Sequence, residues 1–549
     1  MHVALSRSGP ALTAVELDDG GHELRRVQLD DGRLAGFVRE QEPRHPRWVW
    51  NNTSTWYPPL LEAGVRVERC VDLRLSHRIL RHAASAADSA LATSPRDGWD
   101  RPAAAVPDAP ETLFDLEPPP SDDDPVAEWM RQRAAVEGST QPGRLALLLA
   151  AESVGALIAV EMRFAGIPWN PERHDELLTE LLGSRPAPGA RPARMEALLA
   201  QVREALDEPE LNPDSPVELV KGLQRAGIRV SSTRSWELKR IQHPAIAPLL
   251  EYKKLSRLHT ANGWRWAEEW VHDGRFHPVY VPGGVVTGRW AADGGGALQL
   301  PKQVRGAVIA DPGWTFVVAD ASQLEPRVLA AMSGDAAMAL AGQAQDMYQG
   351  MVDAGAVETR PQAKYGMLGA IYGGTTGESG RMKPRIERAF PVAMRYVEDA
   401  ARAGERGEVV STWLGRSSPP GHRDAYDETA SDAQLRQSRS DARSWGRFTR
   451  NFVVQGTAAE WAMCWMGSVR RRLWQMGGGD EADAALTARP HQVFFLHDEV
   501  IVHTPAGLAA EVETVLRESA AEAGRLLFGA APVEFALTVA VVDSYDQAK

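Results

Sequence analysis

The chain has 549 residues, of which 44% are apolar and 24% charged, a composition that is ordinary for a globular protein and excludes a disordered chain. This length exceeds what one hydrophobic core supports, so we expect two to four domains. Its two cysteines, Cys70 and Cys464, are too few for a disulfide framework or a zinc-ligand set and favour a reducing compartment.

No secretory signal is expected, because the N-terminus lacks a basic segment followed by an unbroken apolar run. The most apolar segment, Leu145 to Met162, is interrupted by Glu152 and Glu161, so we predict a buried amphipathic helix there and no membrane span. A cytoplasmic location follows from these two expectations.

The net charge of −12 is not typical of a nucleic-acid-binding protein. Residues 83–125, however, carry −8 of it, which leaves −4 on the other 506 residues. Basic clusters lie at residues 252–257, 381–388, 436–450 and 470–472. Any one such cluster is more often a solvated helix face than a binding site.

In chain order, residues 1–82 predict a small α/β domain, and residues 83–125, rich in Ala, Pro and Asp, predict a linker. Residues 126–276 are dominated by helical patterns. Short strand-like runs then alternate with helices. The fold class expected is therefore α+β, divided among several domains.

The first stretch with a chemical pattern is Trp314 to Asp335, in which a buried strand ends at Asp320 and an apolar helical stripe follows. Ser322 and Glu325 are spaced as a capping box, which is the structural alternative for this stretch. Pro326 fits that alternative poorly. A missing N–H is harmless only in the first part of the first turn, and Pro326 would lie one position beyond it.

The second stretch is Arg360 to Gly374, a predicted helix with one stripe of residues at intervals of four: Arg360, Lys364, Leu368 and Tyr372. Gly366 and Gly369 weaken this helix, so we expect something large to approach its backbone there. A helix with cationic side chains at one end and a flat apolar surface after them could bind the triphosphate and then the base of a nucleotide. A solvent-facing basic helix is the alternative.

The third stretch is Val493 to Pro505, two apolar strands joined at His497, Asp498 and Glu499. No Asn-Gly or Asp-Gly pair favours the turn, so local turn chemistry does not explain these polar residues. An isolated Asp-Glu pair in a turn is usually structural, and only a matching carboxylate such as Asp320 argues for a site.

Together these stretches resemble motifs A, B and C of the family A DNA polymerases. Further matches are "TGRW" at Thr287 to Trp290, "LQLP" at Leu298 to Pro301, and "RFTRNFVVQGTAAE" at Arg447 to Glu460. The resemblance covers about residues 145–546. It implies a right-hand polymerase with an antiparallel palm sheet, helical fingers and thumb, and no 5′ nuclease domain.

The resemblance divides the chain into a degenerate exonuclease-like domain (1–82), the acidic linker (83–125), the thumb with preceding helices (126–276), palm (277–341), fingers (342–444) and palm again (445–549). It implies a monomeric enzyme that adds dNTPs to primer-template DNA, in replication, repair or gap filling.

Two Mg²⁺ ions, with Mn²⁺ as an alternative, would be held by Asp320 and Asp498, with Glu499 as a weaker partner. Arg360 and Lys364 would bind the triphosphate, with Lys364 also the general acid. Glu325 would block a ribose 2′-OH. The other residues implied at the nucleotide are Gln323, Tyr348, Leu368 and Tyr372, and those at the DNA are Arg289, Gln299, Arg447, Asn451, Gln455 and His497.

Several positions depart from the family pattern. Leu368 and Ala321 replace aromatic residues and Tyr348 replaces a histidine, which affects nucleotide affinity and sugar discrimination more than the reaction class. The N-terminal domain lacks the Asp-x-Glu of a proofreading exonuclease. Ser54 and Thr55 lie about where a metal-binding Asp is expected, and the only Asp-x-Glu before the polymerase region, Asp115 to Glu117, lies in the linker. We therefore expect no proofreading.

Two alternatives remain open at this point. A single-subunit RNA polymerase shares the palm, but Glu325 argues for the DNA enzymes. The other alternative is a DNA-binding protein that is catalytically silent or weak. The presence of Asp320, Asp498, Arg360 and Lys364 argues against it.

Overall fold

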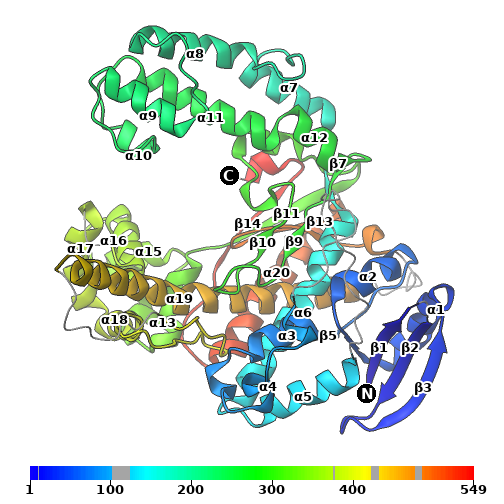
Figure 1. Cartoon of the computed structure of the whole chain (residues 1–549). Coiled ribbons are helices and arrows are strands. Elements are labelled where there is room, and N and C mark those ends of the chain that lie inside the picture. Colours follow the sequence, from blue (N-terminus) through cyan, green and yellow to red (C-terminus); the bar gives the residue numbers. More distant parts are fainter. Residues whose placement is uncertain (10, 102–123, 375–376, 422–431, 477–484, 549) are drawn as a thin grey trace. The chain divides into compact units, whose positions relative to one another are not determined.

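The computed structural model describes residues 1–9, 11–101, 124–374, 377–421, 432–476 and 485–548 (Figure 1). The chain forms two compact units. Unit 1 comprises Met1–Ala165, Val279–Asp293 and Val317–Val541, and unit 2 comprises Gly166–Pro278, Gly294–Phe316 and Val542–Lys549.

The N-terminal part of unit 1 is the α/β domain that the sequence predicts. Its sheet has the order β3-β2-β1-β4-β5, in which β4 is parallel to both β1 and β5 and the remaining pairs are antiparallel. Trp48, Trp50 and Tyr57 are fully buried in its core. The elements are β1 (His2–Ser8), β2 (Ala11–Leu17), β3 (Glu23–Leu29), α1 (Asp31–Gln41), η1 (Glu42–Arg44), β4 (Arg47–Trp50), α2 (Thr53–Glu62), β5 (Cys70–Asp72) and α3 (Leu73–Leu80).

The first part of the predicted linker contains regular structure. Residues 84–100 form three short helices, η2 (Ala84–Ala86), α4 (Ala90–Thr93) and η3 (Gly98–Asp100), which bury Ala86 and Leu91. The guanidinium of Arg81 donates to the carbonyls of Leu91 and Ser94, which explains how a segment so poor in apolar residues is held. The rest of the predicted linker, 102–123, lies outside the described residues.

Two helices follow, α5 (Pro125–Glu137) and α6 (Pro142–Ala165). The predicted division groups them with the thumb as its preceding helices, and they cluster with unit 1. By length and composition α6 could cross a membrane, yet 72% of its most apolar window is buried within the protein, as predicted for a core helix.

Both carboxylates that interrupt α6 are buried against arginines. Glu152 accepts from Arg416 at 2.5 Å, and Glu161 accepts from Arg470 at 2.6 Å and from the hydroxyl of Tyr57. Burial alone would raise the pKa of Glu161, but Arg470 and Arg66 outweigh it and hold that pKa below its usual value. Glu161 therefore ties the N-terminal domain to the helices that follow.

Unit 2 is mostly helical, with a small sheet of order β6-β8-β7. Leu219, Leu223, Leu238 and Leu249 lie fully buried in the core of its helices. Its elements are β6 (Ile167–Pro168), α7 (Pro171–Leu182), α8 (Ala193–Leu206), α9 (Pro216–Arg225), α10 (Ser235–Leu238), α11 (Ile246–Asn262), α12 (Trp264–Trp270), β7 (Val271–His272), β8 (Arg275–Phe276), η4 (Ala297–Gln299), η5 (Lys302–Ala307) and η8 (Tyr545–Ala548).

The remainder of unit 1 is built around a sheet of order β12-β13-β11-β14, with β9 (Tyr280–Val281) and β10 (Ala291–Ala292) forming a separate pair. Every residue of β12 is buried, as the continuous apolar run predicts. The four strands are β11 (Trp314–Ala321), β12 (His491–Leu496), β13 (Glu499–Pro505) and β14 (Leu537–Val542).

Helices surround this sheet, and one of them, α19, is far longer than the others and packs against α6, α18 and α20 (Figure 1). A separate core lies among α15, α16, α17 and α18 and includes Met351, Met367, Ile386 and Phe390. The helices are α13 (Leu324–Ser333), α14 (Ala336–Ala341), α15 (Met347–Asp353), α16 (Arg360–Tyr372), α17 (Gly377–Ala389), α18 (Pro391–Glu405), α19 (Asp432–Met476) and α20 (Ala509–Phe528), with short turns η6 (Leu486–Ala488) and η7 (Ala506–Leu508).

Arg327 of α13 is 1% exposed and connects segments that are distant in sequence. Its guanidinium donates to the carbonyls of Gly342 at 2.7 Å, Glu534 at 2.6 Å, Ala344 at 2.8 Å and Gln345 at 2.9 Å. Burial lowers its pKa to about 10, which still leaves it charged at neutral pH. One cation thus satisfies backbone acceptors that would otherwise be buried without partners.

Glu460 is a buried carboxyl of α19, 2% exposed. It accepts hydrogen bonds from the hydroxyl of Thr412 and, at 3.0 Å, from the backbone N–H of Leu414. Burial raises its pKa to about 7, although these hydrogen bonds and Arg416 act in the opposite direction. The carboxyl is therefore protonated in the folded protein over a pH range in which the unfolded chain ionises it.

We predict that Glu460→Gln removes a pH dependence of stability. Because the folded state binds the extra proton, the contribution of Glu460 is largest below its usual pKa and is lost as pH rises to about 7, by about 3 kcal/mol at most. The midpoint temperature of thermal unfolding of the wild type, measured relative to that of Glu460→Gln, should decrease as the pH is raised from 5 to 7.5. The exposed Glu511→Gln serves as control, and an unchanged difference would contradict the expected titration.

Candidate active site

Asp320 and Asp498 lie beside one another at one edge of the four-stranded sheet. Asp320 is the seventh residue of β11, and Asp498 lies in the turn between β12 and β13. The backbone N–H of Ala321 donates to the carbonyl of Asp498 at 3.0 Å, which fixes the two strands in this register. The structure thus brings together the two aspartates that the sequence predicts as metal ligands.

The turn that presents Asp498 has two residues, since Leu496 pairs with Glu499 across the hairpin. His497, its first residue, has a φ of 62°, a conformation that normally favours glycine. A histidine held there costs about 1 kcal/mol, and such strain is found at functional sites. Burial and the neighbouring Arg289 lower the pKa of His497, so the ring is neutral at pH 7.

Carboxylate oxygens at a rigid sheet edge suit Mg²⁺, which prefers one or two carboxylates together with substrate phosphates. Asp320 and Asp498 offer that donor set. Glu499 is 2% exposed and starts β13, so it is held within the sheet behind the turn.

Glu325 of α13 is the centre of a second group. Its two carboxylate oxygens accept hydrogen bonds from the guanidinium of Arg289 and the hydroxyl of Tyr372. Burial raises the pKa of Tyr372 above its usual value, and the charge of Glu325 adds to this. The group brings the "TGRW" loop, motif A and motif B into direct contact.

The capping-box alternative for Glu325 is wrong. The helix begins at Leu324, and its N-cap is Gln323, which has a φ of 51° and makes no side-chain cap. Pro326 therefore stands third in the helix, where its missing N–H is among those that have no intrahelical partner. The amide oxygen of Gln323 instead accepts from the backbone N–H of Met347 at 3.1 Å, at the start of α15.

Arg360 and Tyr348, both predicted at the nucleotide, lie together. The guanidinium carbon of Arg360 lies 5.8 Å from the centre of the Tyr348 ring. Nε of Arg360 donates to Asp346 at 2.5 Å, an acid that also caps α15. Burial raises the pKa of Tyr348 to about 12, and the negative charges of Glu325 and, to a smaller extent, Asp498 act in the same direction. Tyr348 therefore lies close enough to both carboxylates to interact with their charges.

Helix α16 has the predicted boundaries, with Thr359 as N-cap and Gly373 closing it at a φ of 72°. The close approach expected at its glycines is present, but the neighbour is a helix of the same chain. A Cβ on Gly366 would lie 2.9 Å from the Cβ of Met382, and one on Gly369 would lie 2.4 Å from the Cβ of Ser379, so these residues make room for α17. Lys364 is exposed, whereas Leu368 and Tyr372 are partly buried.

Three predicted DNA contacts lie on α19. Gln455 lies close enough to Tyr372 to lower the pKa of its hydroxyl, and Arg447 lies beside Gly373, where an added Cβ would be 3.2 Å from its Cγ. Oδ1 of Asn451 is buried and has no hydrogen-bond partner among the described residues. Gln299, the remaining predicted contact, belongs to unit 2 and accepts from Arg257 at 3.1 Å.

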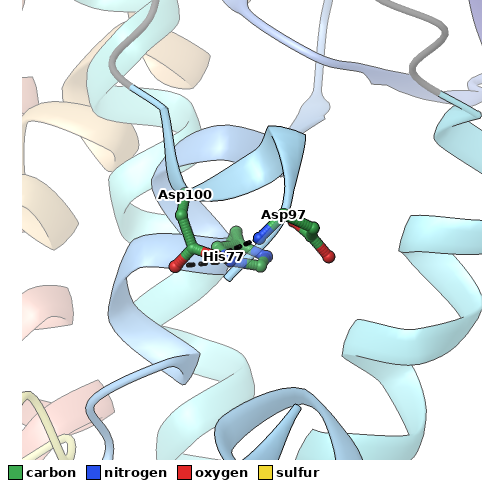
Figure 2. Close-up of side chains that lie close together, drawn as sticks. All are labelled: His77, Asp97 and Asp100. Carbon is green, nitrogen blue, oxygen red and sulfur yellow. Dashed lines mark hydrogen bonds and ion pairs between the residues drawn. The ribbon is translucent and has the colours of Figure 1, made fainter. Parts of the chain in front are cut away.

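A further group of potential metal ligands, which the sequence did not indicate, is formed by His77, Asp97 and Asp100 (Figure 2). Nδ1 of His77 hydrogen-bonds to Glu128 at 2.8 Å. Asp97 and Asp100 form a capping box, and Arg131 and Arg81 pair with them at 2.8 Å and 3.3 Å. Local capping and ion pairing therefore account for these side chains.

Known proteins share this fold. The structure matches that of the POL domain of Pol1 from M. smegmatis in complex with DNA primer-template and dNTP, with a TM-score of 0.71, covering 99% of this chain and 95% of that one at 19% identity. The fold is therefore that of a polymerase domain. The sequence profile of DNA polymerase family A matches residues 191–546, and the chain belongs to this family.

Two curated relatives match a smaller region. DNA polymerase I of Chloroflexus aurantiacus is 28% identical over 324 residues, which is 54% of this chain and 32% of the relative. The thermostable DNA polymerase I of Thermus aquaticus is 26% identical over 321 residues, with shares of 54% and 36%. The match thus spans about a third of the length of these relatives.

Proposed function

We propose that this chain is a template-directed DNA polymerase, which adds dNTPs to the 3′ end of a primer. The observation that carries the proposal is the register in which Ala321 hydrogen-bonds to Asp498, because it places two aspartates of adjacent strands at one sheet edge in a member of family A. A second motif-spanning contact, Glu325 with Arg289 and Tyr372, supports it.

Asp320 and Asp498 would hold the catalytic Mg²⁺ ions, with Mn²⁺ as an alternative. When bound, two such ions stabilise the attacking and leaving oxygens of an in-line displacement at phosphorus. The contribution of the protein is to hold both carboxylates on strands that cannot shift independently, since their register is fixed by the backbone.

The triphosphate would lie along α16. Lys364 is exposed on the same stripe as Arg360 and provides a cation and a general acid for the leaving group. Arg360 is held by Asp346 and would exchange part of that pairing for phosphate. Leu368, Tyr372, Tyr348 and Gln323 would shape the pocket for the base and sugar.

Primer-template contacts would come from Arg289, His497, Arg447, Asn451 and Gln455 in unit 1 and from Gln299 in unit 2. Contacts to the phosphate backbone tolerate any sequence, as copying a template requires. In this proposal the four-stranded sheet is the palm, the region of α15 to α18 the fingers, and unit 2 the thumb. A monomer working in cytoplasmic repair or gap filling is the role that we assign.

We further propose that proofreading is absent. In the N-terminal domain, β1 carries no carboxylate, and Asp72 is buried and accepts from the backbone N–H groups of Thr53 and Leu75. Thr55, near the position where a metal-binding Asp is expected, cannot replace a carboxylate. Among the described residues, the only group of potential metal ligands that includes a residue of this domain is that of His77.

The first prediction concerns the metal ligands. Asp320→Ala and Asp498→Ala should each reduce primer extension to well below about a tenth of wild type, because each removes a metal ligand. Binding of the primer-template duplex should remain, since no phosphate contact is lost. The exposed Asp399→Ala, on α18, should extend normally. Substantial activity in either site variant would refute the assignment.

The second prediction concerns Glu325. Glu325→Ala should raise ribonucleotide relative to deoxyribonucleotide incorporation, because it removes the bulk that would meet a 2′-OH. Glu325→Gln keeps that bulk and should keep the discrimination while weakening the ion pair with Arg289. Measured ratios of kcat/KM for the two nucleotides separate these outcomes, and equal discrimination in all three proteins would show that Glu325 only positions its neighbours.

The third prediction concerns the missing nuclease. With Mg²⁺, a 5′-labelled primer with a mismatched 3′ end and no nucleotides, the primer should stay at full length. Asp498→Ala serves as control, because it inactivates the polymerase site alone. Shortening of the primer by both proteins would locate a nuclease in the N-terminal domain.

A further inference from the structure

Four arginines form a stripe along the first half of α19: Arg436, Arg439, Arg443 and Arg447. At 100° per residue they lie within about 80° of one another around the helix axis. All four side chains are exposed. The eleven-residue interval between the first and the last corresponds to about 16 Å of helix.

The charge of this stripe, hereafter the arginine stripe, is not neutralised by any carboxylate that the structure describes. Among the described residues, no carboxylate pairs with any of the four, and Arg447 donates only to the hydroxyl of Ser444, at 2.7 Å. Asp441, the acid within the same segment, lies on another face and accepts from Gln437. On a chain of net charge −12, an unpaired row of four cations is unusual.

The helix that carries the arginine stripe is fixed against its neighbours. The hydroxyl of Thr449 donates to the carbonyl of Ala400 at 2.8 Å, and Gly446 makes room for Glu405, so a different face of α19 packs on α18. Arg450 is buried and donates to the carbonyl of Ala370 in α16 at 2.9 Å. The arginines are therefore presented on a rigid support.

The stripe also has a defined end. Arg447 lies against Gly373, which closes α16 directly after Tyr372. Tyr372 in turn hydrogen-bonds to Glu325 of the candidate active site. The row of cations therefore begins beside the site and leads away from it along the helix.

We infer that the arginine stripe binds the sugar-phosphate backbone of the single-stranded template before it is copied. Evenly spaced, exposed guanidinium groups neutralise successive phosphates without reading bases, and the stripe is long enough for a few nucleotides. This inference rests on the proposed function, since the template is single-stranded only on the side of the site that has not been copied.

The test compares primer-templates that share one duplex but carry a template overhang of one or eight nucleotides, without dNTPs. Wild type should bind the long overhang more tightly and with a steeper dependence on salt. The triple variant Arg436→Gln, Arg439→Gln, Arg443→Gln should lose that gain, about tenfold or more at 0.1 M salt, and its salt slope should fall by about 2.

A matched variant, Arg33→Gln, Arg96→Gln, Arg525→Gln, removes the same charge from three exposed positions elsewhere and should keep the gain. Both variants should insert one nucleotide on the one-nucleotide overhang at the wild-type rate, which tests the proposed function separately. An unchanged overhang gain in the stripe variant, equal losses on both overhangs, or the same loss in the matched variant would each overturn the inference.

Discussion

The buried guanidinium of Arg327 is the interaction on which the arrangement around the candidate site depends. It donates to carbonyls at both ends of the segment between α14 and α15 and to Glu534, just before β14. The helix that carries Arg327 also carries Glu325, two residues earlier. Because breaking a buried, fully hydrogen-bonded charge leaves several acceptors without partners, the position of Glu325 is set by a side chain that contacts neither Arg289 nor Tyr372.

Strand and helix patterns predicted the elements that carry the candidate site. Asp320, Asp498, Arg360 and Tyr372 each follow an apolar run or a four-residue repeat that the structure reproduces, and the family match agrees with the motifs they form. The sequence was less informative where two different structures are compatible with the same residue pattern. A glycine in a helix records a close approach but not what approaches, and at Gly366 and Gly369 the neighbour is α17.

Other features depend on contacts that no local pattern contains. No local pattern predicts the left-handed backbone of Gln323, or the hydrogen bond that its amide oxygen accepts from Met347 at the start of α15. Residues 84–100 looked unstructured because they are poor in apolar residues, and they are held by Arg81 and by capping. Helix α6 follows the linker in sequence, yet the buried pairs of Glu152 and Glu161 hold it to other parts of unit 1.

The cluster of Tyr57, Glu161 and Arg470 joins the N-terminal domain to the rest of unit 1. Arg470 of α19 also donates to the backbone carbonyl of Glu68, so three elements share one buried charge pair. Removing the domain would expose the apolar face of α6 and strip partners from a carboxylate and a guanidinium that cannot be left buried alone. The N-terminal domain is therefore an integral part of unit 1, because neither α6 nor α19 can be separated from it without leaving a buried charge unpaired.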